Sequence, residues 1–334
     1  DLYGTMYYPL MNMFRTESYG FLFGVFLAIP VFIILSLLYW TINKIWSKTP
    51  EENRTGRRAF FRTAATIVPL ATIGGSSYAA FAGQQELVVT HESFGYTNLP
   101  PGLKNYKIVQ LSDIHIGPSI DLDDFDEILK LALLQKPNRV VITGDLIDKL
   151  AWLPQVCERL TTFAKQIPDG VDFILGNHEY HHDVNKVLDS LKRNTPMNIL
   201  VNSNIQIMGG KQPVYIAGVA YDNDREKEKR EAMIDKALSG IPDYAFVILL
   251  AHHPEFFEES IERKIPLTLS GHTHGGQIVF MGMPLVPTGT PYTKGRYVEE
   301  QSVCYVNNGT GHWFPIRINC PREITVITFF DGVA

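Results

Sequence analysis

The chain has 334 residues, a formal net charge of -5 and three cysteines. This mildly negative net charge gives no nucleic-acid-binding signature, since nucleic-acid-binding domains usually show a strongly basic surface. No protein partner is predicted from the sequence. Cys157, Cys304 and Cys320 are too few and too scattered for a disulfide scaffold; a Cys304–Cys320 disulfide stays open, but buried structural thiols are favoured.

A long uncharged stretch follows the N-terminal flank of residues 1–17. Residues 18–43 contain no charged side chain and include FLFGVFLAIPVFIILSLLYW. This run exceeds the about 20 apolar residues that cross a bilayer, and aromatic residues near its ends suit the membrane interface. We therefore predict a transmembrane helix over residues 18–43.

The next two segments predict the side on which the remaining chain lies. Residues 44–62 carry six Lys and Arg against two Glu, which predicts a basic cytoplasmic loop. Residues 63–85 are uncharged but rich in Ala, Thr, Ser and Gly, and are either a second membrane span or, with Arg57-Arg58 before them, a twin-arginine-like export signal. Both interpretations place residues 86–334 on the periplasmic or extracellular side of a bacterial inner (cytoplasmic) membrane. If residues 63–85 only lie on the membrane surface, the domain stays in the cytoplasm.

Residues 86–334 read as one α/β domain. Short apolar runs predict strands at ELVVTHESF, YKIVQLSD, RVVITGD, VDFILGN, NILVNS, IQIM, PVYIAGVA, FVILLAHHP, LTLS, CYVNNG and ITVITFF. Helical spacing appears in the stretches between several of them, including residues 121–136, 152–166, 183–193, 255–263 and a strongly charged segment near 222–240. This alternation predicts two packed sheets flanked by helices.

Five of these strands end in residues that can ligate a metal. The stretches are Asp113-Ile114-His115, Gly144-Asp145, Gly176-Asn177-His178-Glu179, Ala251-His252-His253-Pro254 and Gly271-His272-Thr273-His274-Gly275-Gly276. Because open α/β sheets place their sites beyond the carboxyl ends of strands, we expect these stretches to converge. In an extended segment His272 and His274 face the same side, while Thr273 points away.

The series DxH, GDxxD, GNHE, a histidine after a strand, and GHTHGGQ resembles the calcineurin-like metallophosphoesterases. The last motif is similar to that of their bacterial membrane-anchored branch, and the resemblance extends from Tyr106 to the C-terminus. It implies a four-layer αββα sandwich with two metal ions. It also implies the ligands: Asp113, His115 and His274 for the first metal, Asn177, His252 and His272 for the second, and Asp145 as the bridge. His178 would act as the catalytic residue beside the scissile phosphate.

The chemistry of these side chains agrees with those implied roles. A carboxylate has two oxygens and can span two cations, which makes Asp145 the natural bridge. Four histidines among the ligands favour Mn, Zn or Fe over Mg or Ca. With two anionic ligands, Asp113 and Asp145, two divalent ions keep a positive excess for an anionic phosphate.

Neighbouring residues have two interpretations each. Asp148 and Glu179 either orient histidine ligands or cap helices. His312, Trp313 and Arg317 either border the pocket, where Arg317 would suit phosphate, or serve packing and a surface ion pair. His181 and His182 are interpreted as solvated loop residues, and alternation turns His253 away from the site.

The resulting functional hypothesis is a membrane-anchored, metal-dependent phosphoesterase. It would cleave phosphodiester or pyrophosphate bonds by attack of a metal-activated hydroxide, on lipid-linked or nucleotide-containing substrates. One alternative is a UDP-2,3-diacylglucosamine pyrophosphatase of lipid A synthesis, whose substrate is cytoplasmic. An alternative of another class is a non-catalytic membrane scaffold or binding protein that retains the fold.

Overall fold

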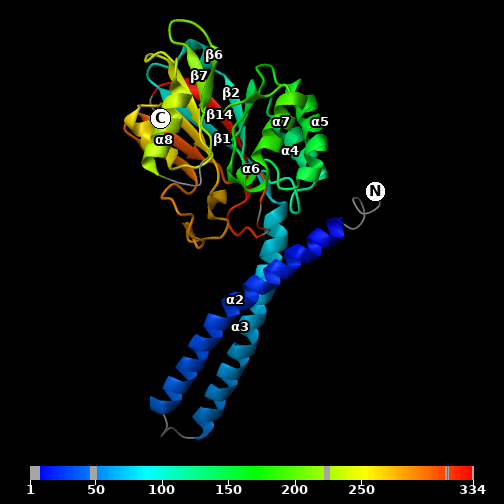
Figure 1. The fold of residues 1–334 in the computed structure, drawn as a ribbon. Helices are drawn as coiled ribbons and strands as arrows, with labels where there is room; N and C mark the ends of the chain where they lie inside the picture. The colour runs from blue at the N-terminus through cyan, green and yellow to red at the C-terminus, as the bar shows by residue number, and fades with distance from the viewer. Residues whose placement is uncertain (1–7, 46–50, 222–225, 313, 315, 333–334) are drawn as a thin grey trace. The chain divides into compact units, whose positions relative to one another are not determined.

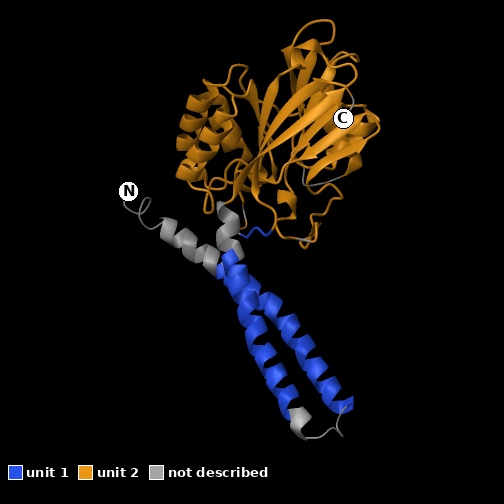
Figure 2. Cartoon of the chain, turned by 180° about the vertical axis from the view of Figure 1, so that it is seen from behind, with its two compact units in different colours: residues 1–85, 315–318 blue, residues 86–314, 319–334 orange. Residues whose placement is uncertain are grey.

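The computed structural model describes residues 8–45, 51–221, 226–312, 314 and 316–332. The chain divides into two compact units, which are coloured separately in Figure 2. The helical unit comprises residues 1–85 and 315–318, and the second unit comprises residues 86–314 and 319–334.

Two long helices form the helical unit. They are α2 (Tyr8–Ile45) and α3 (Glu51–Gln85), which run side by side in Figure 1. Ser76 Oγ donates a hydrogen bond to the carbonyl oxygen of Gly20 at 2.9 Å. A side chain at Gly24 would place its Cβ 2.3 Å from that hydroxyl, so glycine permits this close approach of the two helices.

The first predicted membrane segment is confirmed as a long apolar helix. Within α2, residues Gly20–Ile45 are long and apolar enough to cross a membrane by length and composition, and no other helix of the described residues meets that test. The basic segment predicted as a loop is instead helical from Glu51 onward, because no strong helix breaker separates it from the apolar residues that follow. Whether residues 63–85 span the membrane stays a prediction.

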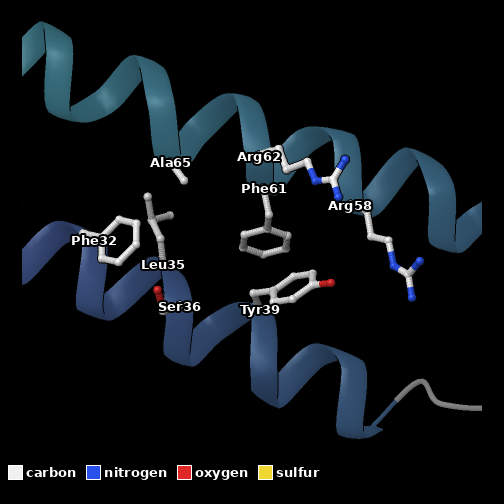
Figure 3. Close-up of a pocket in the computed structure, with 8 residues that line it drawn as sticks. All are labelled: Phe32, Leu35, Ser36, Tyr39, Arg58, Phe61, Arg62 and Ala65. Atoms are coloured by element: carbon white, nitrogen blue, oxygen red, sulfur yellow. The ribbon is translucent and has the colours of Figure 1, made fainter.

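A groove of about 350 Å³ lies between α2 and α3 (Figure 3). Phe32 and Leu35 of α2 and Ala65 of α3 line its apolar end, and Arg58 and Arg62 line the other. The rings of Tyr39 and Phe61 meet edge to face, with centroids 5.2 Å apart, between the two ends. The arginines therefore lie near the carboxyl-terminal end of the apolar helix, as basic residues flanking a membrane span usually do.

The second unit contains two six-stranded sheets. The first has the order β1-β14-β2-β3-β4-β5. Its strands are β1 (Leu87–Tyr96), β2 (Lys107–Leu111), β3 (Arg139–Ile142), β4 (Val171–Phe173), β5 (Asn198–Ile199) and β14 (Arg322–Asp331). Strands β2 to β5 are parallel, and β14 is antiparallel to β2. Leu111 pairs with Ile142 and Ile142 with Phe173, so the carboxyl ends of β2, β3 and β4 lie together.

The second sheet has the order β12-β13-β9-β8-β7-β6. Its strands are β6 (Ser203–Met208), β7 (Val214–Gly218), β8 (Phe246–Leu250), β9 (Leu267–Ser270), β12 (Gly295–Glu299) and β13 (Ser302–Val306). Strands β7, β8, β9 and β13 are parallel, and the edge strands β6 and β12 are antiparallel to their neighbours. The carboxyl ends of β8 and β9 thus adjoin at one edge of this sheet.

Helices cover the outer face of each sheet, as Figure 1 shows. Helices α4 (Leu122–Leu134), α5 (Leu153–Ala164) and α7 (Val184–Asn194) pack on the first sheet through a core that includes Phe125, Leu160 and Val187. Helices α8 (Lys227–Leu238) and α9 (Phe256–Glu262) pack on the second through Ile234 and Phe256. An apolar core between the sheets includes Ile108, Ile174, Leu250 and Leu269. The expected four-layer αββα sandwich is confirmed.

Local sequence explains where these helices begin and end. Asp121 caps α4 by accepting hydrogen bonds from the N–H groups of Asp123 and Asp124. Phe125, Ile128, Leu129 and Ala132 recur at helical spacing and are buried against the sheet. Pro137 follows the helix and cannot continue it.

All three cysteines are free and buried. The interpretation as structural thiols is therefore confirmed, and the open alternative of a Cys304–Cys320 disulfide is wrong. Burial raises the pKa of the Cys304 thiol to about 12, which keeps it protonated at neutral pH.

Replacing Asp172 with alanine should strongly destabilise the domain. The Asp172 carboxylate is buried and accepts hydrogen bonds from Arg139 Nε at 2.6 Å and from Asn198 Nδ2 at 2.8 Å. Removing it leaves a buried guanidinium without its counter-ion, which costs about 3–5 kcal/mol of unfolding free energy. The thermal midpoint of the domain should fall by about 2–4 °C per kcal/mol. Asp189→Ala removes an exposed ion pair with Arg193 and should move that midpoint far less; equal shifts would contradict the prediction.

Candidate metal centre

The structure brings all seven predicted ligands together beyond the strand ends. The loops after β2, β3 and β4 of one sheet meet those after β8 and β9 of the other. The seven residues, Asp113, His115, Asp145, Asn177, His252, His272 and His274, fall into two groups that share Asp145.

In the first group, Nε2 of His115 and Nε2 of His274 lie 3.1 Å apart. The His274 Nε2 atom is 3.6 Å from Oδ1 of Asp113. Candidate ligand atoms of Asp113, His115 and His274 all lie within 4.8 Å of one another. Three ligand atoms therefore surround one small volume.

In the second group, Asn177 Oδ1 lies 2.9 Å from His272 Nδ1 and 3.0 Å from His252 Nε2. The two histidine nitrogens are 3.2 Å apart. Asp145 reaches both groups: its Oδ2 atom is 3.3 Å from Nε2 of His252 and 3.6 Å from Nε2 of His115. The carboxylate of Asp145 therefore lies between the groups.

Hydrogen bonds on the far sides of the rings show which nitrogens face the cluster with a lone pair. A carbonyl oxygen only accepts, so His252 Nδ1 donates to Thr143 at 2.8 Å. An ionised carboxylate also only accepts, so His115 Nδ1 donates to Asp148 at 3.2 Å. In the neutral rings both Nε2 atoms then present lone pairs toward the oxygens of Asp145. Lone pairs that face one another repel unless a proton or a cation lies between them. Imidazole nitrogens and carboxylate oxygens are ligands that suit divalent transition metals.

The negative charges of the site also favour a bound cation. Burial alone would lower the pKa of His252, but the Asp145 and Asp113 carboxylates raise that pKa to about 10. The side chain therefore attracts a positive charge strongly, and a divalent cation competes with the proton for it.

Five of the predicted ligands have a left-handed backbone, with φ of 51° at Asp113, 53° at His115, 52° at Asp145, 70° at His272 and 50° at His274. Residues other than glycine rarely adopt this conformation, and its concentration at one place is typical of functional sites. The expectation of an extended His272–His274 segment is wrong, because these angles turn the chain sharply. His272 consequently lies with Asn177 and His252, while His274 lies with Asp113 and His115.

Two glycines leave room for the ligand carboxylates. A Cβ at Gly176 would lie 2.2 Å from Oδ1 of Asp145, and one at Gly271 would lie 2.2 Å from Oδ2 of Asp113. Glycine is therefore required where the backbone passes these carboxylates.

Asp148 connects two histidines of the site. Its Oδ1 atom accepts hydrogen bonds from Nδ1 of His178 at 2.7 Å and from Nδ1 of His115 at 3.2 Å. Although burial would raise the pKa of Asp148, both histidines hold it well below its usual range. Of its two interpretations, orientation of histidines matches these contacts.

His178 is partly buried, and its pKa is shifted by the same carboxylate. Burial would lower that pKa, but the hydrogen bond with Asp148 and the charges of Asp145 and Asp148 raise it to about 9. Its backbone N–H also donates to Oδ1 of Asp145 at 2.8 Å. The imidazole is thereby held beside the cluster.

Glu179 serves the backbone rather than a histidine. It accepts hydrogen bonds from the N–H groups of Gly176, Asp145 and Leu146 at 2.7–3.0 Å. It thus caps α6 (Asn177–His182) and holds the Asp145 loop in place. The idea that it orients a histidine ligand is wrong, because its oxygens bind backbone donors.

His181 and His182 are exposed, as predicted, but they belong to α6 and not to a loop. His181 lines the pocket, and His182 Nε2 lies 3.6 Å from Asp148. Sequence reasoning missed their proximity, although their helical spacing from His178 was a usable signal. His253 is buried against His272, with ring centroids 4.5 Å apart.

The structure leaves the predicted substrate contacts of His312 and Arg317 as predictions. His312 is buried, and the N–H of its neighbour Gly311 donates to the carbonyl oxygen of Asp113 at 3.0 Å. It is absent from the described lining of the pocket. Arg317 belongs to residues 315–318, which group with the helical unit, and Trp313 lies outside the described residues.

A pocket of about 470 Å³ opens over the metal-ligand cluster. Its lining combines polar residues of the site with a short apolar and hydroxyl segment: Asp145, Asn177, His178, His181, His272, Thr273, His274, Gly276, Gln277, Val286, Pro287 and Thr288. The pocket is large enough for a phosphate ester and part of its substituents.

Comparisons with known proteins agree with this chemistry. A family model described as calcineurin-like phosphoesterase matches residues 106–276. A metallophosphoesterase of Campylobacter jejuni is 36% identical over 237 residues, covering 69% of this chain and 60% of that relative. A Bacillus subtilis metallophosphoesterase is 31% identical over 272 residues, covering 76% of this chain and 90% of the relative. A Danio rerio transmembrane protein with a metallophosphoesterase domain is 27% identical over 318 residues, covering 91% and 71% respectively.

Proposed function

Because the chain belongs to the calcineurin-like phosphoesterase family, we propose that it is a membrane-anchored phosphohydrolase with two metal ions. It cleaves phosphodiester or pyrophosphate bonds by direct attack of water. The observation that supports this most is the pair of ligand groups that share the Asp145 carboxylate.

Each metal has its own set of side chains in this proposal. Asp113, His115 and His274 would hold one metal ion, Asn177, His252 and His272 would hold the other, and Asp145 would be shared by both sets. The histidine-rich set suits Mn, Zn or Fe. When bound, the two cations lower the pKa of a water molecule and offset the charge of the phosphoryl group.

His178 acts as the general acid in this proposal. Its Nδ1 atom is held by Asp148, which leaves Nε2 to donate a proton to the leaving oxygen. The raised pKa of about 9 keeps the ring protonated at neutral pH in the metal-free site, and bound cations would reduce that shift. Asp148 supplies the compensating negative charge on the opposite side of the ring.

The N-terminal helix supports a place at the membrane. The apolar segment Gly20–Ile45 is followed by a basic segment, and a relative is itself named a transmembrane protein. We propose that the chain lies in a bacterial inner membrane with its catalytic domain on the periplasmic or extracellular side. Its substrate would then be a phosphate ester available there, either lipid-linked or nucleotide-containing.

Turnover of bis(p-nitrophenyl) phosphate by the full chain, loaded with Mn or Zn, tests the enzymatic proposal. We expect hydrolysis that a chelator abolishes and added metal restores. A chain that binds two metal ions but hydrolyses neither this ester nor lipid phosphodiesters would favour the scaffold alternative.

Asp148→Asn should weaken metal binding about 10–100-fold, because a carboxylate that accepts a hydrogen bond from a metal-binding histidine orients its ring. The amide lacks the negative charge that Nδ1 of His115 and Nδ1 of His178 both face. Titration of the metal-free protein with Mn, compared with the surface variant Asp189→Asn, measures the change. Unaltered Mn affinity in Asp148→Asn would refute its role in orienting His115.

Cysteine labelling tests the proposed membrane side. The three native cysteines are buried, so single cysteines at the exposed positions Lys211 and Gly56 can be followed separately. We expect a membrane-impermeant maleimide to label Lys211→Cys in intact spheroplasts and Gly56→Cys only after lysis. Labelling of both positions only after lysis would place the domain in the cytoplasm, where a UDP-2,3-diacylglucosamine substrate is accessible.

A further inference from the structure

An exposed apolar segment lies next to the metal centre. We call residues 281–286 the apolar hairpin; they include the turn between β10 (Val279–Phe280) and β11 (Met283–Pro284). The side chains of Met281, Met283, Leu285 and Val286 are 83%, 64%, 56% and 48% exposed. The other strongly exposed large apolar residues in the described part of the domain are scattered: Leu134, Tyr180, Tyr244, Val298 and Phe330. Clustered exposure of this kind marks a binding surface more often than scattered residues do.

The tip of the apolar hairpin keeps a bulky residue in an unfavourable conformation. Met281 has φ of 50° and Gly282 has φ of 83°, so both turn residues are left-handed. Asn or Gly occupies such a position at lower conformational cost. A methionine there is therefore not explained by the turn itself.

The apolar hairpin is anchored on the loop that carries His272 and His274. The N–H of Leu285 donates to the carbonyl oxygen of Ile278 at 2.8 Å. A Cβ at Gly276 would lie 2.4 Å from Cβ of Pro284, so this glycine lets the hairpin pack directly on the metal loop. Farther along, Thr273 Oγ1 donates to the carbonyl oxygen of Thr293 at 2.5 Å. The position of the hairpin relative to the ligands is thus fixed by direct contacts.

The metal-site pocket continues onto this surface. Val286, Pro287 and Thr288 line the same pocket as Asp145, Asn177 and His178. A phosphoryl group at the metal ligands would direct one substituent past Val286 toward Leu285, Met283 and Met281. Methionine side chains are flexible and polarizable, and they adapt to hydrocarbon of irregular shape.

We propose that the apolar hairpin binds the hydrocarbon chain of an amphiphilic phosphate ester whose phosphoryl group occupies the metal site. This inference rests on the proposed phosphohydrolase function and specifies its substrate class. The occupant is the chain of the substrate itself, because the surface is continuous with the lining of the site.

A series of alkyl p-nitrophenyl phosphates tests the proposal. The full chain is reconstituted in nanodiscs and loaded with Mn, and kcat/KM is measured for the ethyl, butyl and octyl esters below their micelle concentrations. In the wild type kcat/KM should rise with chain length, by up to about fourfold for each methylene that becomes buried. In Met281→Ser/Met283→Ser/Leu285→Ser the rise should largely disappear, while turnover of the ethyl ester changes by no more than about twofold.

The matched control is Leu134→Ser/Tyr244→Ser/Val298→Ser, which removes three exposed apolar side chains elsewhere and should retain the wild-type slope. A flat series in the wild type, or an equal loss of slope in both triple variants, would overturn the proposal. Absence of turnover even for the ethyl ester would count against the phosphohydrolase function instead. In that case the affinities of ethyl, butyl and octyl phosphate for the Mn-loaded chain are measured by calorimetry. Affinity should rise with chain length in the wild type and in the control variant but not in Met281→Ser/Met283→Ser/Leu285→Ser.

Discussion

Asp145→Asn is expected to reduce kcat/KM for bis(p-nitrophenyl) phosphate by about 10³-fold or more, which corresponds to about 4 kcal/mol of transition-state stabilisation. Asn matches Asp in size but carries no negative charge. A single oxygen of Asp145, Oδ2, lies near both Nε2 of His115 and Nε2 of His252, and a neutral amide oxygen in its place would bind two cations far more weakly than the carboxylate does. The bound Mn should therefore fall from two ions per chain to one or fewer.

Asp145→Asn changes metal binding without changing the backbone strain at this position. Asp145 has φ of 52°, and Asn tolerates this left-handed conformation as well as Asp does. The thermal midpoint of the metal-free variant should thus stay close to that of the metal-free wild type. Near-normal activity with two bound Mn ions would refute the bridging role of Asp145.

His178→Ala is expected to lower kcat by about 10²–10⁴-fold for a substrate with a poor leaving group, such as a dialkyl phosphate, because it removes the general acid. p-Nitrophenolate leaves without much need for protonation, so the loss should be much smaller for bis(p-nitrophenyl) phosphate. Both metal ions should remain bound, since His178 is tied to Asp148 and not assigned to a metal.

The comparison of leaving groups distinguishes between possible roles of His178. Equal losses for both substrates would show that the ring binds the phosphoryl group rather than protonating the leaving oxygen. A fall in Mn content measured by mass spectrometry of the metals would make His178 a ligand, contrary to our assignment.

Much of the fold could be predicted from apolar patterning alone. Short apolar runs such as RVVI and FVILL predict strands that are buried on both faces of a sheet. Both form fully buried strands, β3 and β8. The alternation of strands with helices such as α4 and α5 then predicted the layered architecture.

The elements that were missed lack such patterns. Helix α6 has the sequence NHEYHH, without apolar periodicity, and begins where Glu179 accepts from the N–H of Gly176. Strands β10 and β11 contain two residues each, and β12 exposes most of its length at a sheet edge. Short elements of this kind depend on tertiary contacts rather than on local propensity.

The metal site, too, could be predicted only in part from the sequence. The position of ligating residues after strands predicted that they converge, because the carboxyl ends of parallel strands lie together. The separation of His272 from His274 could not follow from spacing, since it depends on the left-handed φ of 70° and 50° at these residues. Which metal each histidine holds stays a prediction, as do the catalytic role of His178 and any substrate role of His312 and Arg317.

We propose that the two ligand groups sharing Asp145 form one dinuclear catalytic centre. Stepwise addition of Mn to the metal-free full chain, with bound Mn per chain and turnover of bis(p-nitrophenyl) phosphate measured at each step, tests it most directly. We expect little activity with the first equivalent and a rise to full activity as the second binds. Full activity at one bound ion per chain, or no activity with two, would contradict a dinuclear catalytic centre.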